Sequence, residues 1–400
     1  MQHAVIVSTS RTAIGRAGKG SLIDVRPDDM AAFAIGDALS KVPALDPAEV
    51  EDVILGNGSP AGEAGFNIAR VAALLAGIEG APGVTVNRYC ASSLQAIRMA
   101  THAIRAGEGD VFVAAGVESL SRYGNGAADV GPHNGQFAAA EARTVARTEA
   151  GSETWRPFDG LPDAYIAMGQ TAENVAQLEG ITRAEMDEYA LMSQTRATEA
   201  RTSGFWDAEI TPYPVGDSLV TQDDGIRPGT TLEGLSQLRP VFRPDGLITA
   251  GNACPLNDGA AAVVVMSEKR AAELEITPLA RVVSSAVSAI DPEIMGLGPV
   301  EASRRALDRA SMTIDDVDLV EINEAFAAQV VPSYQDLGID LDRLNVNGGA
   351  IAVGHPFGMT GARLQNTMLN SLDWHDKSTG LITMCVGGGQ GMAMILERVG

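Results

Sequence analysis

The fold of this chain is decided by one stretch, Val84-Thr85-Val86-Asn87-Arg88-Tyr89-Cys90-Ala91-Ser92-Ser93. Its first residues are apolar and β-branched, and apolar residues recur at helical spacing from residue 94 to residue 106. The pattern predicts a strand, a turn and a helix, with the thiol of Cys90 at the turn. The N-terminus of a helix favours a thiolate, because the helix dipole and free backbone N–H groups stabilise negative charge. Cys90 is therefore a candidate nucleophile, although free cysteines also serve as small buried hydrophobic residues.

Length and composition indicate a well-packed globular protein with two or three domains. The 400 residues exceed the usual size of one compact domain. Hydrophobic residues make up 45% and charged residues 20%, which excludes a disordered chain. The formal net charge of −22 argues against a nucleic acid or an anionic membrane as partner. A small anionic ligand is compatible with this charge, provided that it meets a local basic patch.

The number and spacing of the cysteines, and the sequence of residues 1–7, predict a reducing compartment. Cysteines at positions 90, 254 and 385 are too few and too scattered for a disulfide framework or a structural zinc site. No apolar run reaches the length of a membrane span, and residues 1–7 read as a strand rather than a signal peptide. We therefore expect a cytoplasmic protein without a metal site.

The order of elements predicts an α/β architecture with an insertion. Buried strands are expected at 50–58, 84–86 and 110–116, with helices at 30–39 and 67–76 between them. Residues 123–163 are rich in Gly, Ala, Asn and Pro, and helical patterns return at 168–178 and 183–203. We interpret 121–248 as a largely helical and irregular region inserted into the first α/β unit, which resumes at 249–272.

The last third of the chain repeats the plan of the first. Three segments match in order, namely 52–57 with 318–323, 84–87 with 344–347, and 111–116 with 381–387. The repeat predicts a duplicated α/β domain. The expected domains are thus 1–120 plus 249–272, 121–248, and 273–400.

A candidate base for Cys90 comes from the second half. His355 lies in the segment that the repeat places opposite the Cys90 turn, and it precedes a proline, which is favoured at the first position of a helix. An isolated histidine is more often structural, but the quasi-symmetric placement favours a base that faces the thiol.

Two further groups follow predicted strands of the second half. Cys385 precedes the glycine-rich run 387–391, which continues into an apolar segment and so favours a final turn and strand over a dinucleotide-binding turn. Glycines at such a turn let backbone N–H groups point toward an oxyanion. Asn323 follows the strand expected at 318–322, where an isolated asparagine is read as a helix cap.

These residues resemble the motifs of thiolases, the acyl-CoA:acetyl-CoA C-acyltransferases, across nearly the whole chain. The resemblance rests on four motifs in order at family-like spacing, supported by residues 116–119, 168–176 and 252–260. The four motifs are Asn87-Arg88-Tyr89-Cys90-Ala91-Ser92-Ser93, Asn323-Glu324-Ala325-Phe326, Gly354-His355-Pro356 and Cys385-Val386-Gly387-Gly388-Gly389.

The resemblance implies a role for each catalytic residue. Cys90 corresponds to the nucleophile that takes the acyl group as a thioester, and His355 to the base that draws its proton. Cys385 corresponds to the second thiol, which moves a proton at the acetyl α-carbon or at the CoA sulfur. Asn323 would hold a water that completes one oxyanion site with His355, and the backbone N–H groups of Cys90 and Gly387 would form the other.

The resemblance also implies a fold and a ligand. Thiolases stack two α/β halves in five layers, α-β-α-β-α, with a loop domain that covers CoA. CoA is then a substrate, no cofactor is bound permanently, and a homodimer or homotetramer is expected. Arg227 in the loop domain corresponds to a contact with the CoA nucleotide, although a solvated loop arginine is the simpler alternative. Cys254 and Met168 correspond to residues near the pantetheine arm and the acyl group.

Three positions depart from the usual thiolase pattern. Ser93 stands where the family usually has glycine, Cys254 where many members have serine, and Ala167 where short-chain biosynthetic members tend to have histidine. Together with residues 354–360 and the length of 125–163, these features favour a degradative 3-ketoacyl-CoA thiolase of fatty acid β-oxidation. The alternatives are a biosynthetic acetoacetyl-CoA thiolase and a non-catalytic acyl-CoA-binding protein. A decarboxylating ketosynthase would use two histidines, where this chain has Asn323 and Cys385.

Overall fold

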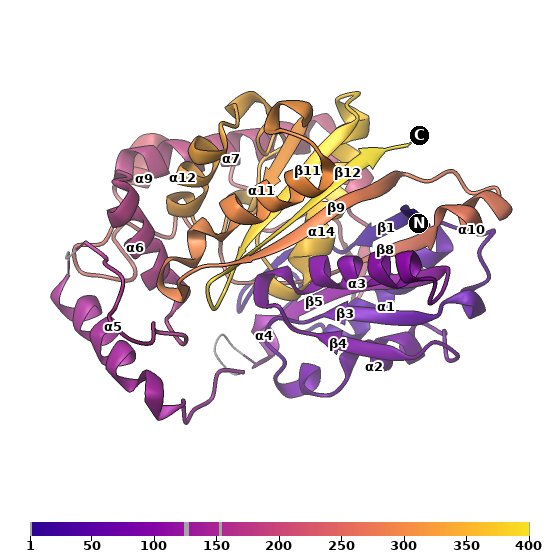
Figure 1. Cartoon of the computed structure of the whole chain (residues 1–400), viewed down its shortest axis with the longest axis horizontal. Helices are drawn as coiled ribbons and strands as arrows, with labels where there is room; N and C mark the ends of the chain where they lie inside the picture. The colour runs from indigo at the N-terminus through magenta and orange to yellow at the C-terminus, as the bar shows by residue number, and fades with distance from the viewer. Residues whose placement is uncertain (1, 124–127, 152–153, 400) are drawn as a thin grey trace.

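The computed structural model describes residues 2–123, 128–151 and 154–399, and a large mixed β-sheet forms its centre (Figure 1). Its strands run in the order β10-β11-β12-β9-β1-β8-β5-β3-β4, and the short β2 pairs with β8. Two further strands, β6 and β7, form a separate hairpin. The strands are β1 Ala4–Arg11, β2 Gly15–Arg16, β3 Asp52–Gly56, β4 Gly83–Val86, β5 Val111–Ser119, β6 Tyr213–Val215, β7 Ser218–Val220, β8 Asn257–Ser267, β9 Ala280–Ala289, β10 Leu319–Ile322, β11 Thr379–Val386 and β12 Gln390–Arg398.

The sheet consists of two halves with the same pairing pattern. In the first half β3 is parallel to β5, and β5, β8 and β1 follow as antiparallel neighbours. In the second half β10 is parallel to β11, and β11, β12 and β9 follow as antiparallel neighbours. The halves meet where β1 pairs with β9 at Val5 and Ile6. This symmetric order supports the duplication expected from the sequence.

The second matched segment differs between the two halves. Residues 84–87 give β4, whereas in 344–347 only a single parallel bridge forms, between Leu344 and Val320. The strand expected there stops because Asn345 has φ 44° and its side chain bonds both the N–H and the C=O of Ile322. At this edge of β10 the Asn345 side chain thus makes the hydrogen bonds that the backbone of a neighbouring strand would otherwise make.

Helices cover both faces of each half-sheet. Helices α3 and α14 lie between the halves, α1 and α2 cover the outer face of the first half, and α11 and α12 cover the outer face of the second. This gives the five expected layers. The helices are α1 Pro27–Ser40, α2 Ile68–Leu75, α3 Ser92–Ala106, α4 Leu120–Tyr123, α5 Ala138–Ala150, α6 Met168–Glu179, α7 Arg183–Ser203, α8 Phe205–Glu209, α9 Leu232–Ser236, α10 Glu268–Glu273, α11 Gly298–Ala310, α12 Ala327–Leu337, α13 Ala350–Val353 and α14 Phe357–Trp374.

The alternation of side chains along the strands explains the layers. In β8, Val263 and Val265 pack with α3 and α14, whereas Val264 and Met266 pack with α1 and α2. This strand therefore contributes to two cores, which is why residues 259–266 are apolar without interruption.

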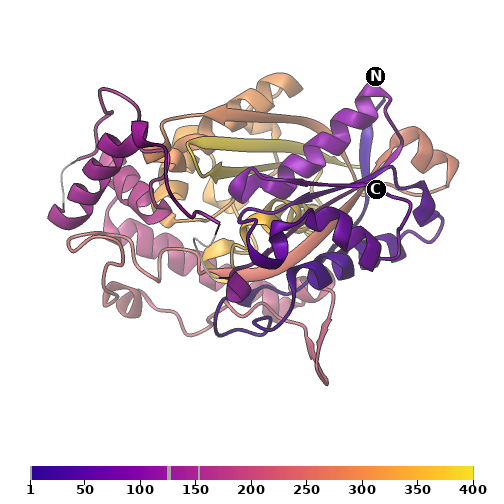
Figure 2. The same cartoon turned by 90° about the horizontal axis from the view of Figure 1, so that it is seen from below.

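The segment 121–248 contains α4 to α9 and the β6–β7 hairpin. Helices α5, α6 and α9 gather at the end of the molecule away from the two chain ends (Figures 1 and 2). Glu324 ties this segment to the second half, since its carboxylate accepts hydrogen bonds from Tyr189 and Ser193 of α7. Helix α5 was not expected, although its Ala, Arg and Glu residues are good helix formers. Residues 125–127 and 152–153, part of the long segment 125–163, lie outside the described residues.

None of the described helices has the length and apolar content needed to cross a membrane. The described residues also contain no group of three or more His, Cys, Asp or Glu side chains arranged to hold a metal ion.

Candidate active site

Cys90 lies in a single 3₁₀ turn, Tyr89–Ala91, directly before α3. The turn packs against the start of α14 and the end of β11, so it is enclosed by the second half. Tyr89 adopts φ 44°, and Asn87 Oδ1 accepts the Tyr89 N–H at 2.7 Å. The backbone N–H of Gly387 donates to the sulfur of Cys90. The turn thus directs a buried thiol toward the glycine turn that follows β11.

Burial decides the protonation state of Cys90. Only 8% of its surface is exposed, and burial raises the pKa of the thiol to about 12, with a smaller increase from the charge of Glu118. The hydrogen bond from Gly387 acts in the opposite direction but is weaker. Desolvation therefore outweighs the helix-end effect on which the sequence argument relied, and Cys90 rests as a neutral thiol.

His355 lies between α13 and α14 and is 1% exposed. Its backbone N–H donates to Asn257 Oδ1 at 2.8 Å, and its Nδ1 lies 2.6 Å from Thr360 Oγ1. The Thr360 hydroxyl donates to the carbonyl of Pro356, so its oxygen accepts a hydrogen bond from the Nδ1–H of His355. This network assigns the tautomer in which Nε2 is the free base. Proline Pro356 is the N-cap of α14, one position earlier than expected.

The imidazole of His355 is also neutral at rest. Burial and, to a smaller extent, the positive charge of Arg363 together lower its pKa to about 3. Arg363 is fully buried and donates from Nη2 to Asn323 Oδ1 at 3.5 Å. The site therefore pairs a neutral thiol with a neutral base, so a proton must move from one to the other as bonds form at sulfur.

Asn323 directly follows β10 and its amide faces the imidazole. Its Nδ2 lies 3.3 Å from His355 Nε2, and its backbone carbonyl accepts from Gln329 Nε2 at 2.6 Å. Helix α12 begins only at Ala327, with Phe326 as its N-cap. The reading of Asn323 as a helix cap is therefore wrong, and its side chain is available to the site.

Cys385 reaches the same region from β11. It is fully buried, and its thiol is close enough to Cys90 and Cys254 to interact with them electrostatically. Burial raises the pKa of Cys385 well above its usual range. Because β10 and β11 are parallel and in register, Asn323 and Cys385 emerge at the same edge of the sheet.

The glycine run joins β11 to β12, so the expected final strand is present and no dinucleotide-binding helix follows. Gly388 and Gly389 adopt φ values of 73° and 77°. A Cβ at Gly387 would lie 3.4 Å from the ring of Tyr89 and 3.6 Å from the sulfur of Met168. Tyr89 and Met168 thus flank Gly387, whose N–H donates to Cys90.

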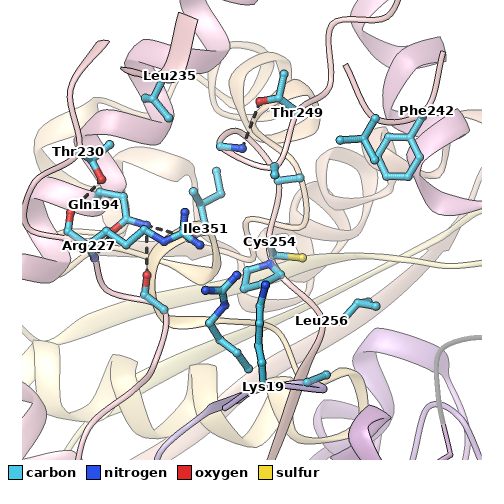
Figure 3. A pocket seen from close by; sticks show the side chains of 18 residues that line it. Lys19, Gln194, Arg227, Thr230, Leu235, Phe242, Thr249, Cys254, Leu256 and Ile351 are labelled. Carbon is cyan, nitrogen blue, oxygen red and sulfur yellow. Dashed lines mark hydrogen bonds between the residues drawn. The ribbon is translucent and has the colours of Figure 1, made fainter. Parts of the chain in front are cut away.

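A pocket of about 330 Å³ opens beside the thiols. Arg16, Lys19 and Arg227 line it, together with Cys254, and none of the described residues that line it is a carboxylate (Figure 3). The backbone N–H of Arg227 donates to Gln194 Oε1 at 2.8 Å, which fixes the loop that carries it. The pocket is the local basic patch that an anionic ligand of so acidic a protein needs.

Ser93 is accommodated without strain. It is fully buried, and its Oγ accepts the Ala362 N–H of α14 at 2.9 Å. A Cβ at Gly361 would come within 2.2 Å of Leu94 N, so the helices touch backbone to backbone here. The serine thus links α3 to α14 rather than loosening the turn.

The structure places Cys385 close to Cys90, and Asn323 against His355. The turn that carries Cys90 packs against α14, which begins two residues after His355. Arg227 and Cys254 line the adjoining pocket. Sequence reasoning assigned no role to several of their neighbours. Arg16 had a detectable signal, since it belongs to a polar loop bounded by glycine after the first strand. The others become visible only through tertiary contacts, and they are Lys19, Glu118, Asn257, Thr360 and Arg363.

Comparisons with known proteins agree with this geometry. Residues 4–269 match the thiolase N-terminal domain and residues 276–398 the thiolase C-terminal domain. The chain is 45% identical to a 3-oxoadipyl-CoA/3-oxo-5,6-dehydrosuberyl-CoA thiolase of Escherichia coli and 44% identical to a 3-ketoacyl-CoA thiolase of Aeromonas hydrophila, over the full length of both chains in each case. The crystal structure of the Bacillus anthracis acetyl-CoA acetyltransferase superposes with a TM-score of 0.86 at 37% identity, covering 100% of this chain and 99% of that one. The chain therefore belongs to the thiolase family.

Proposed function

We propose that Cys90, His355, Cys385 and Asn323 are the catalytic residues of this thiolase, an acetyl-CoA C-acyltransferase that cleaves 3-ketoacyl-CoA with CoA. The observation that carries the proposal is that the buried thiols of Cys90 and Cys385 interact, while the Cys90 turn packs against α14, directly after His355. The His355 imidazole in turn has an unprotonated Nε2 that faces the Asn323 amide, and a basic pocket opens beside the thiols. This set is what a reversible Claisen reaction needs, namely a nucleophile, a base, an acid at carbon and donors for the oxyanions.

In the first half-reaction the sulfur of Cys90 attacks the 3-keto carbon while its proton passes to His355 Nε2. The alkoxide that forms collapses, the bond between C2 and C3 breaks, and the electron pair moves onto C2 as an enolate. Cys385 then gives its proton to C2, so acetyl-CoA leaves and the shortened acyl group remains on Cys90 as a thioester. Burial keeps Cys90 and His355 neutral before the substrate binds, because an ion pair would be costly in this buried site. The order of steps above agrees with this, since it begins with a neutral thiol and a neutral imidazole.

In the second half-reaction CoA regenerates the thiol. The Cys385 thiolate takes the proton of the CoA thiol, and the CoA sulfur attacks the thioester carbon. The Cys90 sulfur departs and recovers its proton from His355. The N–H of Gly387, which already points at the Cys90 sulfur, lies where it can donate to a thioester oxyanion, together with the N–H of Cys90.

The degradative direction with medium or long acyl chains is the favoured form of this function. Relatives of equal length include 3-ketoacyl-CoA and 3-oxoadipyl-CoA thiolases, but also an acetyl-CoA acetyltransferase of Cupriavidus necator at 44% identity. The absence of histidine before Met168 supports the degradative form over the biosynthetic one.

Thiolysis of a chain-length series tests the proposal. Purified enzyme is given CoA with acetoacetyl-CoA, with longer straight-chain 3-ketoacyl-CoA substrates and with 3-oxoadipyl-CoA, and the released acetyl-CoA is measured. We expect kcat/KM to rise beyond acetoacetyl-CoA by about tenfold, as added methylenes become buried. Activity that falls steeply after acetoacetyl-CoA would instead assign the biosynthetic form, and no acetyl-CoA from any substrate would exclude the proposed catalytic residues.

Arg227 is proposed to bind the phosphates of CoA, with Arg16 and Lys19 beside it in the pocket. We expect Arg227→Ala to raise the KM for CoA about tenfold with little change in kcat, because this contact is made equally in the ground and transition states. Arg304→Ala is the matched control, since Arg304 pairs with Asp336 at the surface outside the pocket. An unchanged KM for CoA in Arg227→Ala would return this residue to the role of a solvated loop arginine.

The proposal extends to domains, assembly and compartment. We propose that 1–120 plus 249–272 and 273–400 are the two thiolase halves and that 121–248 is the CoA-covering domain.

The outer edge of β4, at the end of the strand order, supports a homodimer or homotetramer, because an edge strand can pair with another chain. Light scattering checks this, and a monomeric mass would contradict it. A cytoplasmic location stays a prediction for microscopy of the tagged protein.

A further inference from the structure

Glu118 is a buried carboxylate that contacts both halves of the molecule. It lies near the end of β5 and is fully buried. Its Oε2 accepts the backbone N–H groups of Gly58 and Gly358, both at 2.9 Å. Its Oε1 accepts from Asn57 Nδ2 at 3.3 Å. Asn57 and Gly58 follow β3 in the first half, whereas Gly358 belongs to the first turn of α14 in the second half.

The first turn of α14 lies directly on the ends of β3 and β5. A Cβ at Gly358 would come within 2.3 Å of the carbonyl of Val117, and a Cβ at Gly116 within 2.0 Å of the carbonyl of Gly358. A Cβ at Gly58 would lie 2.8 Å from Phe357 Cβ. The turn and the strand ends therefore meet backbone to backbone, and the carboxylate bridges them at the positive end of the helix.

The same turn carries the base of the active site. His355 precedes Gly358 by three residues, and its Nδ1 is held by Thr360 of this turn at 2.6 Å. Cys90, in contrast, belongs to the first half. The distance between the base and the nucleophile therefore depends on how the start of α14 sits on the first half. Three side chains of the first half bond across this boundary: Asn257 to the N–H of His355, Ser93 to that of Ala362 and Glu118 to that of Gly358. Glu118 is the one that carries a charge.

The duplication gives this contact a counterpart. At the strand ends of the second half, the N–H of Gly387 donates to the sulfur of Cys90 at the start of α3. At the strand ends of the first half, Glu118 accepts from Gly358 at the start of α14. Each half therefore forms a hydrogen bond to the residues at the start of a helix of the other half: Gly387 bonds at the start of α3, and Glu118 bonds at the start of α14.

We propose that Glu118 is a positioning residue that aligns His355 with Cys90 by anchoring the first turn of α14 to the ends of β3 and β5. This inference rests on the roles proposed above for His355 and Cys90. Glu118 itself is not placed in contact with the substrate.

The charge of Glu118 supplies a readout that a purely structural residue would lack. Burial and then this charge raise the pKa of Cys90. The other titratable groups that interact with this thiol are Cys385 and Cys254. His355 lies before α14, against which the Cys90 turn packs. Since burial raises the pKa of Cys90 to about 12 and lowers that of His355 to about 3, alkylation of the wild-type thiol should rise through the alkaline range without a plateau near neutral pH.

Two substitutions of Glu118 distinguish the effect of its hydrogen bonds from the effect of its negative charge. Glu118→Gln keeps an oxygen for Gly58 and Gly358 but removes the charge, whereas Glu118→Ala removes both. We expect kcat for thiolysis to fall less than about tenfold in Glu118→Gln and about 100-fold in Glu118→Ala, the cost of misplacing a catalytic group by about 1 Å. The KM for CoA should stay within about twofold of wild type, because neither variant touches the pocket. In both variants the pH curve for iodoacetamide alkylation of Cys90 should move to lower pH, since the nearby negative charge is gone.

The nucleophile should thus become more acidic while the enzyme becomes slower. Wild-type kcat in Glu118→Ala, or equal losses in the two variants, would overturn the positioning role. If Glu118→Ala does not fold, Glu118→Gln decides alone: a loss of about 100-fold, or an unmoved alkylation curve, would overturn the proposal. Asp318→Ala is the matched control, because Asp318 accepts the N–H groups of Ser378 and Thr379 at 3.0 and 2.9 Å, at the opposite end of β10 from Asn323. The Asp318→Ala change should lower Tm without changing kcat or the pH curve for alkylation of Cys90.

The proposed function is tested separately by thiolysis with the wild-type enzyme, because alkylation of Cys90 does not require turnover.

Discussion

Replacement of Cys90 by alanine is expected to lower kcat for thiolysis by at least about four orders of magnitude. In the proposed reaction the sulfur of Cys90 forms the covalent thioester intermediate. Its loss therefore abolishes the whole reaction pathway, whereas loss of a supporting residue would only slow it. The measurement is acetyl-CoA release from a 3-ketoacyl-CoA with saturating CoA. Because Cys90 is a small buried residue on a well-packed turn, removing its sulfur should leave the fold intact, which circular dichroism checks.

Mass spectrometry of the acylated protein separates this prediction from a loss of binding. Wild type incubated with acyl-CoA should gain one acyl group on the peptide that contains Cys90, and Cys90→Ala should gain none. Cys254→Ala is the matched control, since Cys254 is the other cysteine whose thiol interacts electrostatically with both Cys90 and Cys385. It should still acylate Cys90. An acyl group found on Cys254 or Cys385 in the Cys90→Ala variant would contradict the assignment of the nucleophile.

The strands and the duplication could be predicted because their signal is local. The largely apolar runs at 53–56 and 381–386 indicate strands buried on both faces, and the order of such runs along the chain indicates the repeat. The same argument failed at 344–347, where apolar residues alternate with asparagine. There Asn345 bonds the backbone of Ile322, and this side-chain alternative to a ladder is a tertiary event.

The catalytic residues were found by motif, but their electrostatics were not. A helix N-terminus predicts an acidic thiol at Cys90, whereas burial by the second half has the larger effect and the opposite sign. The neutral state of His355 likewise depends on its burial and on Arg363, a residue from the interior of α14. Such effects arise from segments that are about 270 residues apart in sequence, so no local pattern reports them.

Replacement of Cys385 by alanine should separate the two halves of the chemistry. Breaking the carbon–carbon bond leaves an enolate whose carbon needs a proton, and in the proposed reaction Cys385 is the group that provides it. Exchange of CoA on the acyl-enzyme, in contrast, expels a thiolate that is stable in water without an acid. We therefore expect Cys385→Ala to lower thiolysis about 1000-fold but to lower acetyl exchange between acetyl-CoA and labelled CoA only about tenfold.

The two rates are measured on the same preparation, so an error in the active enzyme concentration cancels in their ratio. In Cys90→Ala both rates should vanish together, and in wild type both should be fast. Equal losses of thiolysis and exchange in Cys385→Ala would mean that the proton transfer between Cys385 and the CoA sulfur, which both reactions share, matters more than the proton transfer at carbon. The position of Cys385 supports the unequal losses. It is buried on β11 and close enough to Cys90 for the two thiols to interact electrostatically, so a proton donor lies beside the atom that carries the acyl group while the carbon–carbon bond breaks.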